Sequence, residues 1–300
     1  MRKGRGILDA RLEENRNNIV LTGLARSGTT LACQLLNKLP DTVALVEPIS
    51  PNKFANLPTH AAMAEGIERY FKDQRRMALR KGKVTSKHVG GAVPDNTYEN
   101  TSSGTPRRKV STKGDIPVGK KLDRDFNLVI KQPGLFTALL PALSKRFPCY
   151  ALIRNPLSVL ASGSTIRTFG TTAQRDSKRK HPPTMPRFNE DLATALAERK
   201  GNRMERRLYL LSWQFERFRD ELPADHVIRY EDVVSSRGKA FSVVVPSAGE
   251  LDEPLKSKNL NELYDREQML KFGEALLESD GAYWDFYSRS DVEELLNQLH

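Results

Sequence analysis

The sequence predicts an α/β protein: a P-loop-type parallel sheet flanked by helices, interrupted by a long basic insertion. Two observations lead to this prediction. Short apolar segments of strand length alternate with longer segments of helical apolar spacing. The first apolar segment runs into a glycine-containing loop and then a helical segment, which is how a phosphate-binding α/β unit begins. A chain of 300 residues is long enough for one such domain, and we expect residues 1–300 to form one.

The expected strands are short and apolar at nearly every position, which is typical of parallel strands buried on both faces. They are Asn18 to Thr22, Val43 to Val46, Asn127 to Lys131, Cys149 to Ile153 and His226 to Tyr230. The expected helices are Thr29 to Leu39, Leu135 to Phe147, Pro156 to about Arg167, Met204 to Asp220, Asn261 to Leu277 and Asp291 to Leu299.

The segment 81–121 differs from the rest of the chain. It is rich in Lys, Arg, Gly, Ser and Thr and has few apolar residues. Such composition favours a flexible insertion or a mobile lid over a packed layer. A solvated loop without a function is the alternative.

The charge balance is basic, with 48 Lys+Arg against 37 Asp+Glu and a net charge of +11. Such a balance favours an anionic partner, and nucleic acid, acidic lipid, acidic glycan or a multiply charged nucleotide would each satisfy it. A non-enzymatic nucleic-acid binder would show a steep salt dependence. The basic stretches lack interleaved aromatic residues that would stack on bases, so we expect no nucleic-acid partner.

The remaining bulk features point to a cytoplasmic protein. Cys33 and Cys149 both lie in apolar surroundings, which indicates buried residues and not a disulfide. No stretch of about 18 apolar residues is present, so we expect no transmembrane helix, while peripheral membrane contact stays open. The first residues lack the apolar core of a secretory signal. The sequence gives no indication of oligomeric state.

The glycine loop spans Gly23 to Thr30 and matches the spacing of a nucleotide P-loop, except that Thr29 stands at the lysine position. Backbone N–H groups at a helix N-terminus bind anions, and Thr29 and Thr30 add hydroxyl donors. An ATPase or kinase also needs the lysine and a carboxylate for Mg²⁺. The loop therefore indicates a bound phosphate without a metal, although an ordinary strand-to-helix turn has the same residues.

Two further motifs follow predicted strands. Arg154 ends one strand and Ser162 stands eight positions later, where arginine offers bidentate contact to a phosphate. A surface arginine and a small packing serine are the alternative interpretation. The second motif is Arg229-Tyr230-Glu231-Asp232, which follows the last expected strand.

Together these motifs resemble the sulfotransferases that use 3′-phosphoadenosine 5′-phosphosulfate (PAPS), over roughly residues 18–234. The resemblance implies that Arg26, Ser27, Gly28, Thr29 and Thr30 bind the 5′-phosphosulfate. It also implies that Arg154 and Ser162 bind the 3′-phosphate and that Tyr230 lies near the nucleotide. Arg26 is similar to the arginine of carbohydrate and tyrosyl-protein members, because cytosolic phenol-type members carry lysine there.

The resemblance also suggests a catalytic base. Cytosolic members use a histidine in a Lys-Thr-His segment, but the corresponding residues here are Lys131-Gln132-Pro133. Glu47 ends a strand before a proline, as in carbohydrate and tyrosyl-protein members, and is our candidate base. Pairing of Glu47 with a nearby arginine is the alternative. Arg26 and Lys131 would neutralise the transferring sulfuryl group.

Other implications concern the partners. Lys258, in the basic segment 255–259, either closes over the nucleotide or belongs to a solvated linker. The resemblance implies PAPS as co-substrate, no metal, and an acceptor hydroxyl, most readily that of a carbohydrate or glycolipid. A P-loop kinase or NTPase acting on a phosphorylated substrate is the alternative function.

Overall fold

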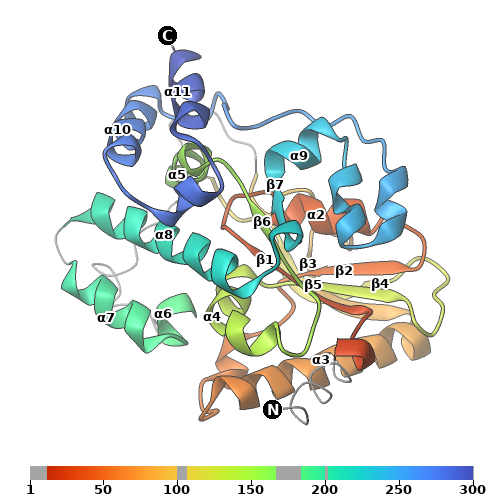
Figure 1. The fold of residues 1–300 in the computed structure, drawn as a ribbon. Coiled ribbons are helices and arrows are strands. Elements are labelled where there is room, and N and C mark those ends of the chain that lie inside the picture. The colour runs from red at the N-terminus through yellow and green to blue at the C-terminus, as the bar shows by residue number, and fades with distance from the viewer. Residues whose placement is uncertain (1–11, 100–106, 167–183, 200–201, 300) are drawn as a thin grey trace.

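The computed structural model describes residues 12–99, 107–166, 184–199 and 202–299. Within them, the main sheet has five parallel strands in the spatial order β2-β5-β1-β6-β7 (Figure 1). Their bounds are β1 Asn18–Gly23, β2 Thr42–Val46, β5 Asn127–Lys131, β6 Cys149–Ile153 and β7 Val227–Arg229. The five expected strands are confirmed, with ends shifted by at most one residue, and so is the parallel sheet.

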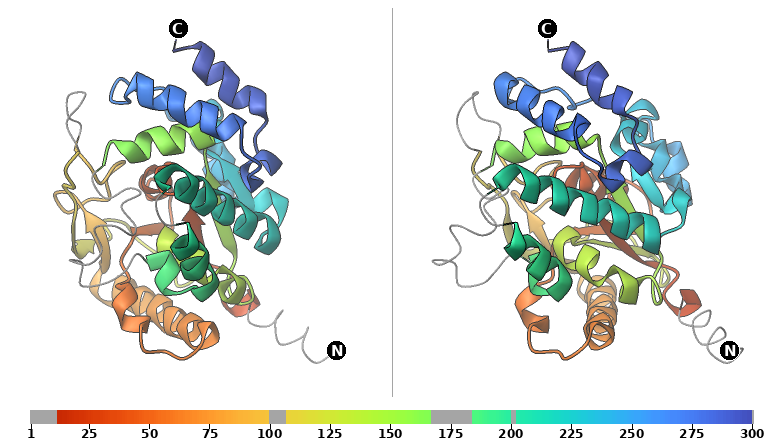
Figure 2. Two further views of the ribbon diagram at one scale, coloured as in Figure 1. Left: turned by 90° about the vertical axis from the view of Figure 1, so that its left-hand side faces the viewer. Right: turned by 60° about the vertical axis from the view of Figure 1, so that its left-hand side comes forward.

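Helices cover both faces of this sheet (Figures 1 and 2). The buried side chains divide accordingly: Ile19 and Leu21 of β1 belong to one core and Val20 to the other. The first core is closed by α2 (Thr29–Leu36), α9 (Tyr230–Ser235) and two 3₁₀ turns, Lys239–Val243 and Pro246–Glu250. The second is closed by α3 (His60–Lys81), α4 (Pro133–Leu143), α5 (Pro156–Ser164), α8 (Arg203–Glu221), α10 (Arg266–Leu277) and α11 (Arg289–Asn297). Two shorter helices, α6 (Thr184–Arg187) and α7 (Glu190–Glu198), lie beside α4 and α8.

Helix α3, two strands within the segment 81–121, and the short helices α6, α7 and α9 were not expected. Helix α3 runs for 22 residues from a cap, where the Thr59 side chain accepts a hydrogen bond from the Ala62 N–H at 3.1 Å. Within the segment 81–121, β3 (Lys83–His88) and β4 (Thr112–Pro117) form an antiparallel pair. The hydroxyl of Ser86 accepts a hydrogen bond from the Val46 N–H at 2.9 Å, so β3 is attached to the edge strand β2. Part of the expected insertion therefore has regular structure, while residues 100–106 lie outside the described residues.

Both cysteines are buried and free, as expected. In the described ranges, every helix is too short or too polar to serve as a membrane span.

The strand order places a crevice beside β1. The chain passes from β1 to the edge strand β2, returns through β5, and then crosses to β6 on the other side of β1. In open α/β sheets, ligands bind outside the carboxyl ends of the strands at such a reversal. The loop after β1 is therefore the expected place for a ligand.

Candidate functional site

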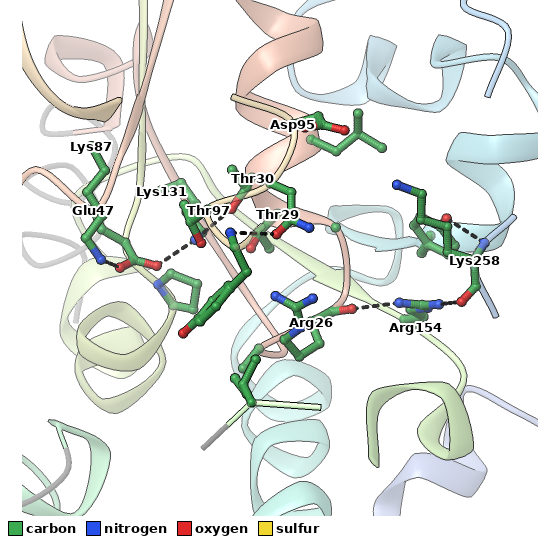
Figure 3. Close-up of a pocket in the computed structure, with 18 of the residues that line it drawn as sticks. Arg26, Thr29, Thr30, Glu47, Lys87, Asp95, Thr97, Lys131, Arg154 and Lys258 are labelled. Atoms are coloured by element: carbon green, nitrogen blue, oxygen red, sulfur yellow. Dashed lines mark hydrogen bonds and ion pairs between the residues drawn. The ribbon is translucent and has the colours of Figure 1, made fainter. Parts of the chain in front are cut away.

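A pocket of about 610 Å³ opens at the carboxyl ends of the strands (Figure 3). Every strand of the main sheet delivers a candidate residue to it: the glycine loop after β1, Glu47 after β2, Lys131 at the end of β5, Arg154 after β6 and Tyr230 after β7. Lys258 lines the same pocket. Residues of both predicted clusters thus line one cavity, although Ser27 and Ser162 are not among its lining residues.

The glycine loop is held in a conformation that requires glycine at two positions. Gly28 has φ 90°, and a Cβ there would lie 3.0 Å from Cδ2 of Tyr230. Gly23 has φ 136°, and a Cβ there would lie 2.2 Å from the carbonyl oxygen of Leu152 on β6. Helix α2 follows with no side-chain cap and no acidic residue in its first turn. Its first N–H groups lack intrahelical acceptors, so this end of the pocket favours an anion.

The hydroxyl groups of the loop have different roles. The Ser27 hydroxyl is buried, 2.8 Å from the Leu24 carbonyl oxygen and 2.7 Å from that of Leu152, so it ties the loop to β6. Thr29 and Thr30 line the pocket. The Thr30 hydroxyl also accepts a hydrogen bond from Nζ of Lys131 at 3.4 Å.

Arg26 lies among other cations. Its Nε donates to Oγ of Ser162 at 3.0 Å, and its guanidinium lies 5.3 Å from the ring centroid of Tyr98. Burial, together with the nearby charges of Arg107 and Arg154, lowers the pKa of Arg26 to about 10. The guanidinium group stays protonated at neutral pH. A bound anion beside it would offset both the cost of burying this charge and the repulsion from the neighbouring arginines. The Ser162 hydroxyl, which the sequence predicts to bind a phosphate with Arg154, therefore contacts Arg26.

Arg154 joins three segments. Only 4% of the residue is exposed. Its Nη1 donates to the carbonyl oxygen of Arg26 at 3.0 Å, its Nε donates to Oδ1 of Asn259 at 2.8 Å, and its Nη2 donates to the carbonyl oxygen of Lys258. Its guanidinium lies 4.6 Å from the ring centroid of Tyr230. These contacts bring the basic segment 255–259 against the glycine loop.

The segment 255–259 is fixed at the pocket by residues of α9. The Tyr230 hydroxyl accepts a hydrogen bond from the Lys258 N–H at 3.0 Å, and Oε1 of Glu231 accepts one from Nδ2 of Asn259 at 2.8 Å. Lys256 and Lys258 both line the pocket and are exposed to solvent. The positioning roles of Glu231 and Asn259 were missed, although Glu231 lies within the recognised Tyr-Glu-Asp motif.

Glu47 is paired with two lysines. Nζ of Lys131 lies 2.7 Å from its Oε1, and Nζ of Lys87 binds its Oε2. Burial opposes ionisation of Glu47, but the charges and hydrogen bonds of the two ammonium groups outweigh it and hold its pKa well below the usual range. The partners are lysines, where the sequence analysis considers an arginine. Lys87 comes from β3, inside the segment 81–121, and its role was not foreseen.

The backbone at Glu47 is also unusual. It has φ 43°, in the left-handed region that a non-glycine residue seldom adopts. The Glu47 N–H donates to the Lys131 carbonyl oxygen at 2.7 Å, which continues the β2–β5 pairing past the end of β2. Strained backbone of this kind is concentrated at functional sites, where the surrounding structure maintains it.

Gln132 is a further pocket residue without an assigned role. Only 7% of it is exposed, and it lines the pocket directly after Lys131. Its Oε1 is buried and has no hydrogen-bond partner among the described residues. In the sequence, Gln132 stands out only as a departure from the Lys-Thr-His pattern.

Neither the protein-family models nor the curated proteins include a match to this chain. The solved structures that are similar to it over most of its length include two sulfotransferases. The sulfotransferase domain of the Synechococcus PCC 7002 olefin synthase has a TM-score of 0.35 and 14% identity, covering 93% of this chain and 92% of that one. A sulfotransferase from Alicyclobacillus acidocaldarius has a TM-score of 0.35 and 17% identity, covering 89% and 98%. Similarities at this level of identity and TM-score do not assign a function. The function is therefore inferred from the residues that line the pocket.

Proposed function

We propose that this protein transfers the sulfuryl group of PAPS to an acceptor hydroxyl. One observation carries the proposal: the glycine loop and the Arg154–Lys258 cluster line a single pocket. A nucleotide that carries a phosphosulfate on its 5′ oxygen and a phosphate on its 3′ oxygen has two separate anionic groups, one for each cluster. The pocket is lined by seven basic and two acidic residues, which suits such a ligand.

Each end of the pocket offers suitable chemistry. The N-terminus of α2, with Thr29 and Thr30, would bind the 5′-phosphosulfate through N–H and hydroxyl donors. Arg154 and Lys258 would bind the 3′-phosphate, with the Tyr230 ring between the two clusters. Ser27 and Ser162 would contribute by fixing the loop and orienting Arg26, because their hydroxyls bond to protein groups.

Glu47 is the proposed general base. Its carboxylate is ionised at neutral pH, so it can accept the proton of the acceptor hydroxyl. Pairing with two lysines weakens its basicity. An incoming sulfuryl group would compete for the Lys131 ammonium, which already reaches from Glu47 to Thr30 of the glycine loop. Sharing Lys131 with the sulfuryl oxygens would raise the pKa of Glu47 when the donor nucleotide is bound. Arg26 would neutralise the negative charge that develops on the leaving 5′-phosphate.

The rival P-loop kinase or NTPase is less compatible with this pocket. Thr29 replaces the lysine that such enzymes place on the transferred phosphate. Of the two acidic residues that line the pocket, Glu47 is already neutralised by two ammonium groups. The described residues include no cluster of His, Cys, Asp and Glu suited to a metal. Transfer without a metal ion is part of the proposal, as the resemblance to the PAPS-dependent sulfotransferases implies.

We further propose that the acceptor is a hydroxyl group of a carbohydrate or glycolipid. What supports it is the strand-end glutamate together with an arginine in the glycine loop. The segment 81–121 contributes Lys87, Asp95, Tyr98 and Lys109 to the pocket wall, beside Glu47 and the loop. We propose that this segment takes part in covering the reacting groups.

Calorimetric titration tests the nucleotide class directly. The protein should bind 3′-phosphoadenosine 5′-phosphate (3′,5′-ADP), the product left after sulfuryl transfer, and should not bind ATP with or without Mg²⁺. Transfer of radiolabelled sulfur from PAPS to a glycan mixture would then establish the reaction. Tight, Mg²⁺-dependent binding of ATP with no binding of 3′,5′-ADP would replace this proposal with the kinase or NTPase alternative.

A further inference from the structure

The strand pair β3–β4 brings lysines together beside the pocket. Lys87 of β3 lies directly opposite Lys113 of β4 in this antiparallel pair, so the two side chains leave the same face. Lys109, just before β4, lines the pocket together with Lys87. Lys53 lies in the 3₁₀ turn Pro51–Phe54 and is close enough to Lys113 to affect its pKa. We refer to Lys53, Lys87, Lys109 and Lys113 as the lysine cluster.

The ammonium groups of the lysine cluster repel one another. Burial and the charge of Lys87 both lower the pKa of Lys109, and the negative charge of Glu47 only partly opposes them. Burial and the charges of Lys53 and Lys87 likewise lower the pKa of Lys113. Like charges that face each other directly across two strands destabilise the pair. An anion bound among these lysines would offset this repulsion.

The acidic residues beside the lysine cluster do not balance its charge. Glu47 pairs with Lys87 but is shared with Lys131, which is not part of the cluster. Asp115 projects from the face of β4 that carries the cluster, but its Oδ1 accepts a hydrogen bond from the Thr85 hydroxyl at 2.8 Å. Among the described residues, the other three members of the cluster form no ion pair. The cluster therefore carries an excess of positive charge.

The contacts of Glu47 place the lysine cluster on the side away from the glycine loop. Lys131 binds Oε1 of Glu47 and also reaches Thr30 of the loop, whereas Lys87 binds Oε2. Figure 3 shows Glu47 between Lys87 and Lys131, with Thr30 beyond Lys131. In phosphoryl transfer, a related reaction, the attacking and leaving oxygens lie roughly in line. With the donor at the loop, an acceptor that meets Glu47 in this way comes from the side of the lysine cluster.

A negatively charged group suits the lysine cluster and can reach it. Lys53, Lys109 and Lys113 are exposed, and Lys87 is half-buried. Ammonium groups donate hydrogen bonds of about 2.7–2.9 Å to the oxygens of carboxylates and phosphates. Because Lys87 binds Glu47, an anion oxygen on the same ammonium group would lie within about 6 Å of the Glu47 carboxylate. That distance places the charge on the sugar ring that carries the reacting hydroxyl, or on the next ring.

We propose that the lysine cluster binds a negatively charged substituent of the acceptor, which is therefore an acidic carbohydrate and not a neutral one. The inference rests on the proposed sulfuryl transfer and adds the charge that selects the acceptor. An anion bound there would draw the Lys87 ammonium away from Glu47, as the donor's sulfuryl group would draw Lys131. Glu47 would then become a stronger base once both substrates are bound.

The test compares acceptors that differ in one kind of charged group. Transfer from PAPS is measured with methyl glucopyranoside, methyl glucuronopyranoside and methyl glucopyranoside 6-phosphate, and with oligogalacturonate and its carboxyl-reduced form. We expect kcat/KM to be at least about tenfold higher for an anionic acceptor than for its neutral partner, the effect of one charge-assisted hydrogen bond. The glucuronide and the 6-phosphate distinguish a carboxylate from a phosphate as the recognised group.

The double variant Lys109→Gln/Lys113→Gln removes two charges without changing Glu47 or its ion pairs. It should reduce the preference for the anionic acceptor to less than about threefold, while the affinity for 3′,5′-ADP stays within about twofold. Lys81→Gln/Lys83→Gln is the matched control, because it removes two exposed lysines where α3 meets β3, outside the pocket lining. The control should keep the wild-type preference.

Three results would overturn the inference and leave the proposed function intact. These are neutral acceptors that react as well as their anionic partners, an unchanged preference in the folded double variant, and no transfer to any anionic acceptor by a wild-type protein that binds 3′,5′-ADP. Failure of the wild-type protein to bind 3′,5′-ADP would instead reject the proposed function. The two failures are therefore distinguishable.

Discussion

Nζ of Lys131 lies 2.7 Å from Oε1 of Glu47 and 3.4 Å from Oγ1 of Thr30. A single buried ammonium group thereby connects the proposed base to the proposed phosphosulfate loop. Any anion that enters the loop competes with Glu47 for this cation. The basicity of Glu47 should therefore depend on whether the loop is occupied, which couples proton acceptance to the presence of the donor nucleotide.

Replacement of Glu47 by glutamine tests the base. We expect Glu47→Gln to lower kcat about 10²–10⁴-fold, the usual contribution of a general base. The affinity for 3′,5′-ADP should not fall, and should rise if the loop anion takes over the Lys131 ammonium. Turnover and calorimetry measure the two quantities separately. Glu253→Gln is a suitable control, because Glu253 also pairs with a lysine, Lys38, but outside the pocket. Near-wild-type turnover in Glu47→Gln would remove Glu47 from this role.

The ion pairs of Glu47 predict that the stability of the fold depends on pH, and the same variant tests this. The pKa of Glu47 is depressed in the folded protein, so its ion pairs stabilise the fold above the unfolded-state pKa of about 4.3. This contribution is lost as the pH falls through the folded-state pKa. At pH 7, Glu47→Gln leaves the buried Lys131 ammonium less well paired and should cost roughly 1–3 kcal/mol of unfolding free energy.

Urea unfolding from pH 7 to pH 2.5 measures this effect. The difference between wild type and Glu47→Gln should be largest near pH 7 and should shrink below about pH 4. A difference that stays constant over the whole range would show that the lysine pairs do not stabilise the ionised carboxylate.

Gly28→Ala tests the conformation of the glycine loop. The φ of 90° disfavours any side chain, and the new Cβ would lie 3.0 Å from the Tyr230 ring. We expect a loss of about 1–3 kcal/mol in stability together with weaker 3′,5′-ADP binding. Gly249→Ala is the control, since Gly249 has no positive φ and its nearest contact would be an ordinary 3.8 Å. Equal effects of the two substitutions would contradict the described loop geometry.

Tyr230→Phe tests the attachment of the segment 255–259. The variant removes the hydroxyl that accepts the Lys258 N–H at 3.0 Å but keeps the ring beside Arg154. Loss of one such hydrogen bond should weaken 3′,5′-ADP binding about two- to tenfold. Tyr209→Phe, on α8 and outside the pocket lining, provides the comparison. An unchanged dissociation constant in Tyr230→Phe would show that this hydrogen bond does not position Lys258 for the nucleotide.

The main sheet was predictable because each strand is an apolar run bounded by polar or turn residues. Five pocket residues could be predicted to lie together, because they follow or end strands and the carboxyl ends of parallel strands meet at one edge of a sheet. They are Arg26, Glu47, Lys131, Arg154 and Tyr230. Helix α3 escaped prediction because its apolar stripe, which includes Met63, Ile67 and Phe71, lies between many charged residues.

Contacts between side chains from distant segments were not predictable. Lys87 is 40 positions from Glu47 in the chain, and only the attachment of β3 to β2 brings the two together. Ser162 has a spacing that suits a phosphate shared with Arg154, but its hydrogen bond from Arg26 could not be predicted from that spacing. Among the described residues, Oε1 of Gln132 has no hydrogen-bond partner because no donor lies near it in the fold. A sequence does not show which groups surround a side chain.

The central claim is that two phosphates of one nucleotide are held by two clusters, and a combined change in protein and ligand tests it most directly. Calorimetry compares 3′,5′-ADP with 5′-AMP on wild type and on Arg154→Lys, which keeps the charge but loses the bidentate guanidinium. We expect wild type to prefer 3′,5′-ADP, and Arg154→Lys to weaken it about tenfold while changing 5′-AMP less than about twofold. Equal affinity of wild type for the two nucleotides, or an equal loss for both in Arg154→Lys, would contradict the claim.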